Sequence, residues 1–267
     1  WRWYGSFLSP LPRHVPRLCI AMQHYRASAC CWAMMMTLIV VAVVSGALLA
    51  GAAWGLYGKL GRRTEGFLVA LAGGALLLSV VSELIEPSIE RSSVTVAMLG
   101  VLAGAVVFTG IDYLIDEKLG GQSGGGLLAA ITLDGVPENL ALGVALIGAQ
   151  PLEVAALAGS ILLSNLPEAA GSAREMAEGG RSKGRIMLLW AGTALLLSAA
   201  AIIGNVALEG VSEHALAAIR CFAAGAVVAS LATEVFPKAY KEDHHLAGVA
   251  TALGVVLAFG LGSLGGS

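Results

Sequence analysis

The sequence predicts an all-α, polytopic membrane protein built as a bundle of eight transmembrane helices. Of its 267 residues, 57% are apolar and only 13% are charged, whereas an average soluble domain is about 25% charged. The 35 glycines fit such a bundle, because small residues let helix backbones approach closely in lipid. The net charge of −2 shows no excess of basic residues that would indicate a nucleic-acid partner.

Eight apolar stretches are long enough to cross a bilayer, which takes about 20 residues. They fall at 37–57, 66–86, 94–115, 126–147, 153–174, 186–207, 214–236 and 245–264. Most Lys and Arg residues after the first span lie in or beside the first, third, fifth and seventh loops. Because basic residues are enriched in cytoplasmic loops, we expect a multi-pass protein of the cell (inner) membrane with both termini outside the cytoplasm.

The first 33 residues differ from the rest of the chain. They contain four Arg and three Pro, and Met34-Met35-Met36 follows them. We interpret residues 1–33 as an N-terminal extension that is disordered or not native to the protein, and residues 34–267 as the eight-helix transmembrane domain. The four Cys form no CxxC pattern, so neither a disulfide framework nor a zinc finger is predicted.

Two short motifs in the fourth and fifth predicted spans place polar residues inside the membrane. They read Asp134-Gly135-Val136-Pro137-Glu138 and Ser164-Asn165-Leu166-Pro167-Glu168. In each motif an oxygen-bearing side chain precedes the Glu by four residues, which puts both side chains on one face of a helix. A carboxylate at the bilayer centre costs about 2.5–3.5 kcal/mol. We therefore expect a positive charge to compensate Asp134, Glu138 and Glu168.

Pro137 and Pro167 are predicted to kink the fourth and fifth helices. Proline has no backbone N–H and clashes with the carbonyl four residues earlier, so the carbonyls of Leu133 and Leu163 lose their helical partners. Freed backbone at membrane depth is tolerated only where it faces protein or a water-filled cavity. We therefore expect the kinks to line a pathway, with the acids and Asn165 near the membrane midplane.

Carboxylate and amide oxygens on two facing helices form a site that suits a divalent cation. At these residues the chain resembles the ZIP (Zrt/Irt-like) metal transporters, whose fourth and fifth helices carry similar Pro-Glu motifs. The resemblance extends from about Met34 to the C-terminus. It implies a homodimer-prone transporter domain that moves Zn²⁺, Fe²⁺, Mn²⁺ or Cd²⁺ toward the cytoplasm by alternating access, with the metal as substrate and no cofactor.

The resemblance places the metal ligands at Asp134, Glu138, Ser164, Asn165 and Glu168. Asp134 stands where the family usually has His, and Ser164 stands where His or Gln is common. The predicted membrane interior contains no His at all. Because zinc prefers imidazole and thiolate ligands, this oxygen-rich set favours Mn²⁺, Fe²⁺ or a broad range of divalent ions.

Further charged residues lie in the second and seventh spans. Glu83, near the outer end of the second span, and Glu234, near the cytoplasmic end of the seventh, are candidates for the entrance and exit of the ion, or for solvated helix ends. Arg220 lies about two turns inside the seventh span, where an unpaired charge is costly. We expect Arg220 to snorkel or to pair with Glu83 or Glu213.

Two other functions fit parts of this pattern. Buried acids would also serve a proton-coupled secondary transporter of another small solute. A membrane-embedded metalloenzyme is disfavoured, because the chain has no HExxH motif and the spans hold no Ser-His or Cys-His pair. We therefore expect no enzymatic activity.

Overall fold

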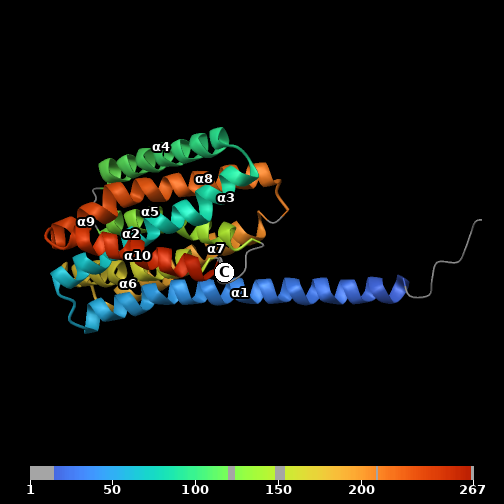
Figure 1. Cartoon of the computed structure of the whole chain (residues 1–267). Helices are drawn as coiled ribbons and strands as arrows, with labels where there is room; N and C mark the ends of the chain where they lie inside the picture. The colour runs from blue at the N-terminus through green and yellow to red at the C-terminus, as the bar shows by residue number, and fades with distance from the viewer. Residues whose placement is uncertain (1–14, 120–123, 148–153, 209, 266–267) are drawn as a thin grey trace, which may run out of the picture. The chain divides into compact units, whose positions relative to one another are not determined.

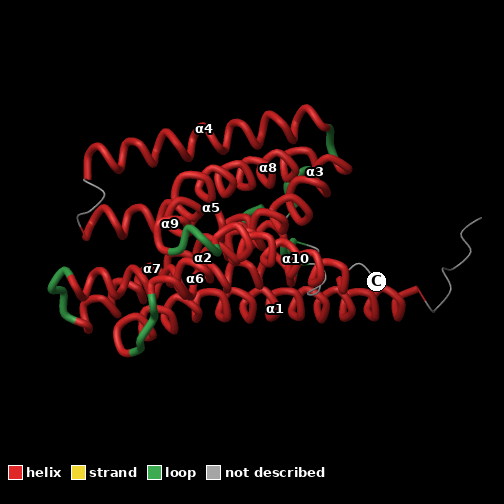
Figure 2. Tube along the Cα trace, turned by 60° about the vertical axis from the view of Figure 1, so that its left-hand side comes forward, coloured by secondary structure: helices red, strands yellow, loops and turns green. Residues whose placement is uncertain are grey.

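A computed structural model of the chain describes residues 15–119, 124–147, 154–208 and 210–265. Side chains are described in these ranges except at 15–33, 116, 118, 119, 124–131, 134, 264 and 265. Regular secondary structure in the described ranges is entirely helical, which confirms the predicted all-α class (Figure 1 and Figure 2). The chain divides into two compact units, Trp1–Met36 and Thr37–Ser267. The second unit contains both Pro-Glu motifs.

The helices follow one another along the chain with short connections. They are α1 (Val15–Tyr57), α2 (Arg62–Val80), the π-helix η1 (Val81–Ile85), α3 (Glu86–Arg91), α4 (Val94–Leu119), α5 (Gly124–Ala145), α6 (Ala155–Glu178), α7 (Lys183–Val206), α8 (Glu213–Ser230), the π-helix η2 (Leu231–Val235), α9 (Phe236–Glu242) and α10 (Ala247–Gly265). α2, η1 and α3 are continuous, as are α8, η2 and α9. α1 begins inside the predicted N-terminal extension. The division of the chain into an extension of residues 1–33 and a transmembrane domain of residues 34–267 stays a prediction.

Five helical stretches among the described residues are long and apolar enough to cross a membrane. They are Met34–Tyr57, Arg62–Arg91, Val94–Ile115, Lys183–Val206 and Glu213–Glu242. These stretches match the predicted first, second, third, sixth and seventh spans and indicate a multi-pass membrane protein. The other three predicted spans fall on α5, α6 and α10. The apolar part of α10, Ala247–Ser263, is shorter than a typical span, and the count of eight spans stays a prediction.

Glycine contacts hold helices of the second unit together in pairs. α2 packs against α10, and α4 packs against α8, the latter pair lying side by side in both views (Figure 1 and Figure 2). A Cβ added at Gly74 of α2 would collide with the carbonyl of Thr251 on α10, and one at Gly254 would collide with the carbonyl of Leu71. These pairs thus show the close backbone approach that small residues permit between helices in lipid.

The same contacts recur about 150 residues away, between α4 and α8. A Cβ at Gly225 of α8 would meet the carbonyl of Val101 on α4, and a Cβ at Gly104 of α4 would meet the carbonyl of Phe222 on α8. In this comparison α8 is equivalent to α2, and α4 is equivalent to α10. The order along the chain is reversed, because α2 precedes its partner α10 whereas α8 follows its partner α4. The arrangement of α2 and α10 is therefore repeated by α8 and α4.

A second feature supports this internal repeat. Each of the two long helical stretches contains a five-residue π-helix, η1 or η2, with a Glu inside it. The short helix that follows has Pro as its second residue, Pro87 in α3 and Pro237 in α9. The sequence analysis did not predict this repeat, although Ser82-Glu83 before Pro87 and Thr233-Glu234 before Pro237 were its visible signal.

We expect Gly225→Ala to lower the thermal midpoint of unfolding in detergent micelles, whereas Gly192→Ala does not. A methyl group at Gly225 pushes α8 away from α4, and such overpacking costs about 1–3 kcal/mol. Gly192 of α7 is exposed and has open space around it, so Ala there only improves helix propensity, by up to about 1 kcal/mol. Equal midpoints for the two variants would contradict the close approach of α4 and α8.

The apolar core next to the motifs holds α5 and α6 in register. Leu142 of α5 and Ile161 of α6 are buried in one cluster that also contains Leu84 and Leu231. Leu142 lies one turn after Glu138, and Ile161 lies about one turn before Ser164. The core therefore fixes the backbones of α5 and α6 relative to each other next to both motifs.

Candidate functional site

The two Pro-Glu motifs lie inside α5 and α6, which contact each other. Glu138 of α5 is 7% exposed and Ser164 of α6 is similarly buried. The Ser164 hydroxyl donates to Glu138 Oε1 at 3.3 Å and to the carbonyl of Ile161 at 3.0 Å. The bond to its own helix is the usual way a Ser is accommodated there, and the bond to Glu138 joins the two motifs.

Glu168 is the second carboxylate of this site. Its side chain is partly exposed, and it lies close enough to Glu138 for the two acids to interact electrostatically. Glu168 also interacts with Lys238 of α9. Because like charges repel more strongly in a low dielectric than in water, two ionised carboxylates here call for a cation or a proton between them.

Asn165 faces a different neighbour from Ser164. It is 2% exposed, and its Nδ2 donates to the carbonyl of Val44 on α1 at 3.2 Å. This bond fixes the amide and leaves its carbonyl oxygen as the atom that could coordinate a cation. The part of α6 just before Pro167 is thus tied to α1 as well as to α5.

Asn139 is a buried polar residue that the sequence analysis did not propose. Its Nδ2 donates to the carbonyl of Gly135 at 2.9 Å, and its buried Oδ1 has no hydrogen-bond partner among the described residues. Such unsatisfied oxygens are uncommon in protein interiors. The signal was present in the sequence as an amide directly after Glu138 within an apolar stretch.

The predicted ligand set is only partly visible. Glu138, Ser164 and Glu168 lie together, and Asn165 is the neighbour of Ser164 on α6, whereas the side chain of Asp134 lies outside the described residues. No group of three or more His, Cys, Asp or Glu side chains in the described part of the chain is placed to hold a metal ion. The described site therefore consists of two carboxylates with hydroxyl and amide groups beside them.

The internal repeat relates these two motifs. Gly55 of α1 packs against the carbonyl of Ala170, two residues after Glu168. Gly204 of α7 packs against the carbonyl of Leu140, two residues after Glu138. The two Pro-Glu motifs therefore occupy equivalent positions. The motif of α6 lies beside α1, the helix before α2, and the motif of α5 lies beside α7, the helix before α8.

No protein-family model matches this chain, and no curated protein is detectably similar to it in sequence. The resemblance to ZIP transporters therefore depends on the two motifs and on the order of the apolar stretches.

The proposed entrance and exit residues share an unusual backbone setting. Glu83 lies in η1 and Glu234 lies in η2. π-helical turns are rare and frequently occur at functional sites. Each copy of the repeat therefore has an acid in its π-helix, the third residue in η1 and the fourth in η2, whereas the sequence analysis treated the two as unrelated helix ends.

Arg220 of α8 agrees with only one of the two alternatives predicted for it. It is 5% exposed, and its Nη2 donates to the carbonyl of Val144 on α5 at 3.1 Å. The expectation that it snorkels to the membrane surface is wrong, because this side chain is packed between α8 and α5. Glu213, one of its expected partners, interacts electrostatically with Arg220 and also lies 3.7 Å from Arg91.

A buried charge cluster lies further along α6 from Glu168, and the sequence analysis did not predict it. Glu65 of α2 is 1% exposed, and its carboxylate is 2.8 Å from Arg174 Nη2 and 3.8 Å from Lys238 Nζ. Arg174 also donates to the carbonyl of Leu60 at 3.0 Å. A Cβ at Gly171 would collide with the Glu65 carboxylate. The cluster thus ties α2, α6 and α9 together.

Proposed function

We propose that this protein is a divalent metal cation transporter similar to the ZIP family, moving metal toward the cytoplasm. The observation that carries the proposal is that Glu138 and Glu168, on two Pro-containing helices, interact with each other. The Ser164 hydroxyl of α6 also donates to Glu138 of α5. Acids inside membrane helices are costly and mark ion or proton pathways. A doubly charged cation offsets both carboxylates at once, which a neutral solute would not do.

Each residue of the site has a distinct role in this proposal. Glu138, Glu168 and Asp134 are charged ligands, Asn165 contributes its carbonyl oxygen, and Ser164 is a weaker or water-mediated ligand. Asn139 Oδ1 is a further oxygen on the same helix as Glu138. Hard oxygen ligands suit Mn²⁺, Fe²⁺ or a broad range of divalent ions better than they suit zinc alone.

The proposed topology places eight spans in the inner membrane, with kinks at Pro137 and Pro167 and with both termini outside the cytoplasm. In it, α2 is part of an even-numbered span and α8 of an odd-numbered one, so the two copies of the internal repeat cross the membrane in opposite directions. Inverted repeats of this kind are common in transporters with alternating access, where the substrate lies near the midplane between the repeats. Glu83 and Glu234 then stand at opposite mouths of the pathway.

Uptake by purified protein in liposomes tests this function. Proteoliposomes loaded with a metal-sensitive fluorophore should accumulate Mn²⁺, Fe²⁺, Zn²⁺ or Cd²⁺ faster than empty liposomes prepared from the same lipids. Elemental analysis of the purified protein should also identify a bound divalent ion. Failure of all four metals to enter faster than in empty liposomes would end the proposal.

A proton-coupled transporter of another small solute is the second candidate. It is favoured by the interaction between Glu138 and Glu168, because two facing acids can share a proton without any metal. A metal-free proton gradient that drives solute uptake, together with a lack of metal uptake, would favour this candidate.

A further inference from the structure

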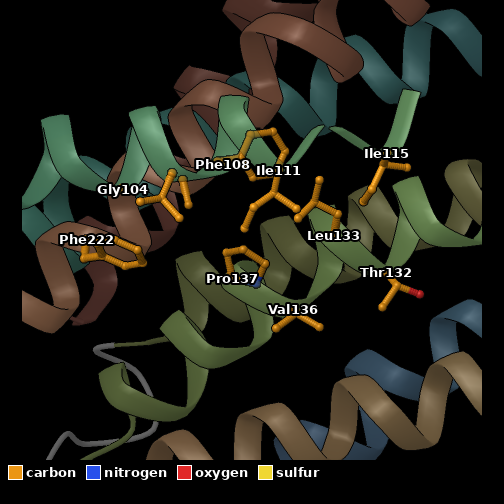
Figure 3. A pocket seen from close by; sticks show the side chains of 11 residues that line it. Gly104, Phe108, Ile111, Ile115, Thr132, Leu133, Val136, Pro137 and Phe222 are labelled. Atoms are coloured by element: carbon orange, nitrogen blue, oxygen red, sulfur yellow. The ribbon is translucent and has the colours of Figure 1, made fainter. Parts of the chain in front are cut away.

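A cavity of about 590 Å³ lies between α4, α5 and α8 (Figure 3). Among the lining side chains that the structure describes, Thr132 is the one polar residue, and the other walls include Val107, Phe108 and Phe222. Ile111 of α4 and Pro137 of α5 point toward each other across it (Figure 3). The volume falls within the range of about 300–1,000 Å³ that is typical of small-molecule sites.

The cavity adjoins a surface that the bilayer covers. α4 contributes the candidate membrane span Val94–Ile115, of which little is buried inside the protein. Val106 on this helix is 70% exposed, and Leu102 and Ile111 are also exposed. In a multi-pass membrane protein these side chains contact lipid tails, and Ile111 belongs both to this exposed face and to the cavity wall. The cavity is therefore continuous with the lipid-facing surface of α4.

Neither water nor a helix of a second protein copy is a suitable occupant of this cavity. Apolar cavities do not retain water, because a buried water needs two to four polar partners. A cylinder 10 Å across with this volume is only about 7.5 Å long, which corresponds to about five residues of helix. A membrane-spanning helix of a second copy has about 20 residues and would remain largely outside. A lipid tail is thin and flexible enough to enter.

We propose that the cavity between α4, α5 and α8 binds one acyl chain of a membrane phospholipid. The chain lies against Ile111 and reaches Pro137, the residue before Glu138. The polar headgroup stays at the membrane surface, since the described side chains of the lining provide one hydroxyl and no charge for it. This site does not depend on metal transport, so it stands whether or not the proposed function holds.

Photolabelling of the full chain tests the proposal. The purified protein is reconstituted in phosphatidylethanolamine and phosphatidylglycerol vesicles that contain a trace of phospholipid with a diazirine near the end of one acyl chain. After irradiation, labelled peptides are mapped by mass spectrometry. We expect the label to concentrate on cavity residues of both α4 and α5, including Ile111 and Pro137. Label spread evenly along the exposed faces of α4, α7 and α10 would overturn the proposal.

Variants with a matched control make the test independent of labelling bias. Ile111→Trp and Val107→Trp fill the cavity from α4 at exposed positions that tolerate a larger side chain, and each should reduce labelling of α5 at least fivefold. Val106→Trp adds the same bulk to the same helix but faces away from the cavity, so it should leave α5 labelling unchanged. Equal labelling of α5 in all three variants would contradict the site, as would efficient cross-linking of two copies through Ile111→Cys.

Discussion

Glu168→Gln should reduce metal uptake in proteoliposomes by more than about 100-fold while the protein still folds and inserts. Gln keeps the size of the side chain but removes the charge that offsets a divalent ion beside Glu138. Losing an outer partner of a metal ligand already costs about 10–100-fold, so losing a charged ligand should cost more. Initial rates of uptake, measured at equal amounts of reconstituted protein, give the comparison.

Glu175→Gln is the matched control for this experiment. Glu175 lies on the same helix about two turns further on, and its side chain is exposed. The same chemical change there should leave the uptake rate within twofold of the unmodified protein. If Glu168→Gln behaved like Glu175→Gln, the carboxylate site would not bind the transported ion, even if the protein itself transports metal by another route.

The helices were predictable because they follow from local and repeated properties of the sequence. A run of about 20 apolar residues is a strong signal for a membrane span, and five of the predicted spans coincide with long apolar helices. The spacing of four residues between Ser164 and Glu168 places both on one helix face. The short connection between the fourth and fifth spans predicts that these two helices are neighbours. These features need no knowledge of distant contacts.

The other features depend on contacts between distant parts of the chain. Glu65 and Arg174 are 109 residues apart in sequence, and nothing near Glu65 in the sequence indicates that its side chain is buried. The amide of Asn165 turns to the carbonyl of Val44, a choice that only the packing of α1 on α6 decides. The internal repeat was visible only in part, because Ser82-Glu83 and Thr233-Glu234 are short matches, whereas the glycine contacts that define it join helices distant in sequence.

The buried ion pair of Glu65 yields the second large expected effect. Arg174→Met should lower the stability of the protein by about 3–5 kcal/mol, the usual cost of removing one partner of a buried pair. Arg174 provides the closest cation to the Glu65 carboxylate, whereas Lys238 is 3.8 Å away and compensates only part of the loss, so we expect the lower end of this range. Equilibrium unfolding of the protein in mixed micelles, followed by tryptophan fluorescence, measures the change.

A double substitution separates the charge effect from lost packing. In Arg174→Met with Glu65→Gln, no unpaired carboxylate remains, so the double variant should be more stable than Arg174→Met alone, and the coupling energy of the cycle reports the pair. Arg185→Met, at an exposed position of α7, removes an Arg without touching the cluster and should change stability by less than about 0.5 kcal/mol. If Arg174→Met cost no more than Arg185→Met, Glu65 would have to be neutral or solvated, and the cluster would not be the link that joins α2, α6 and α9.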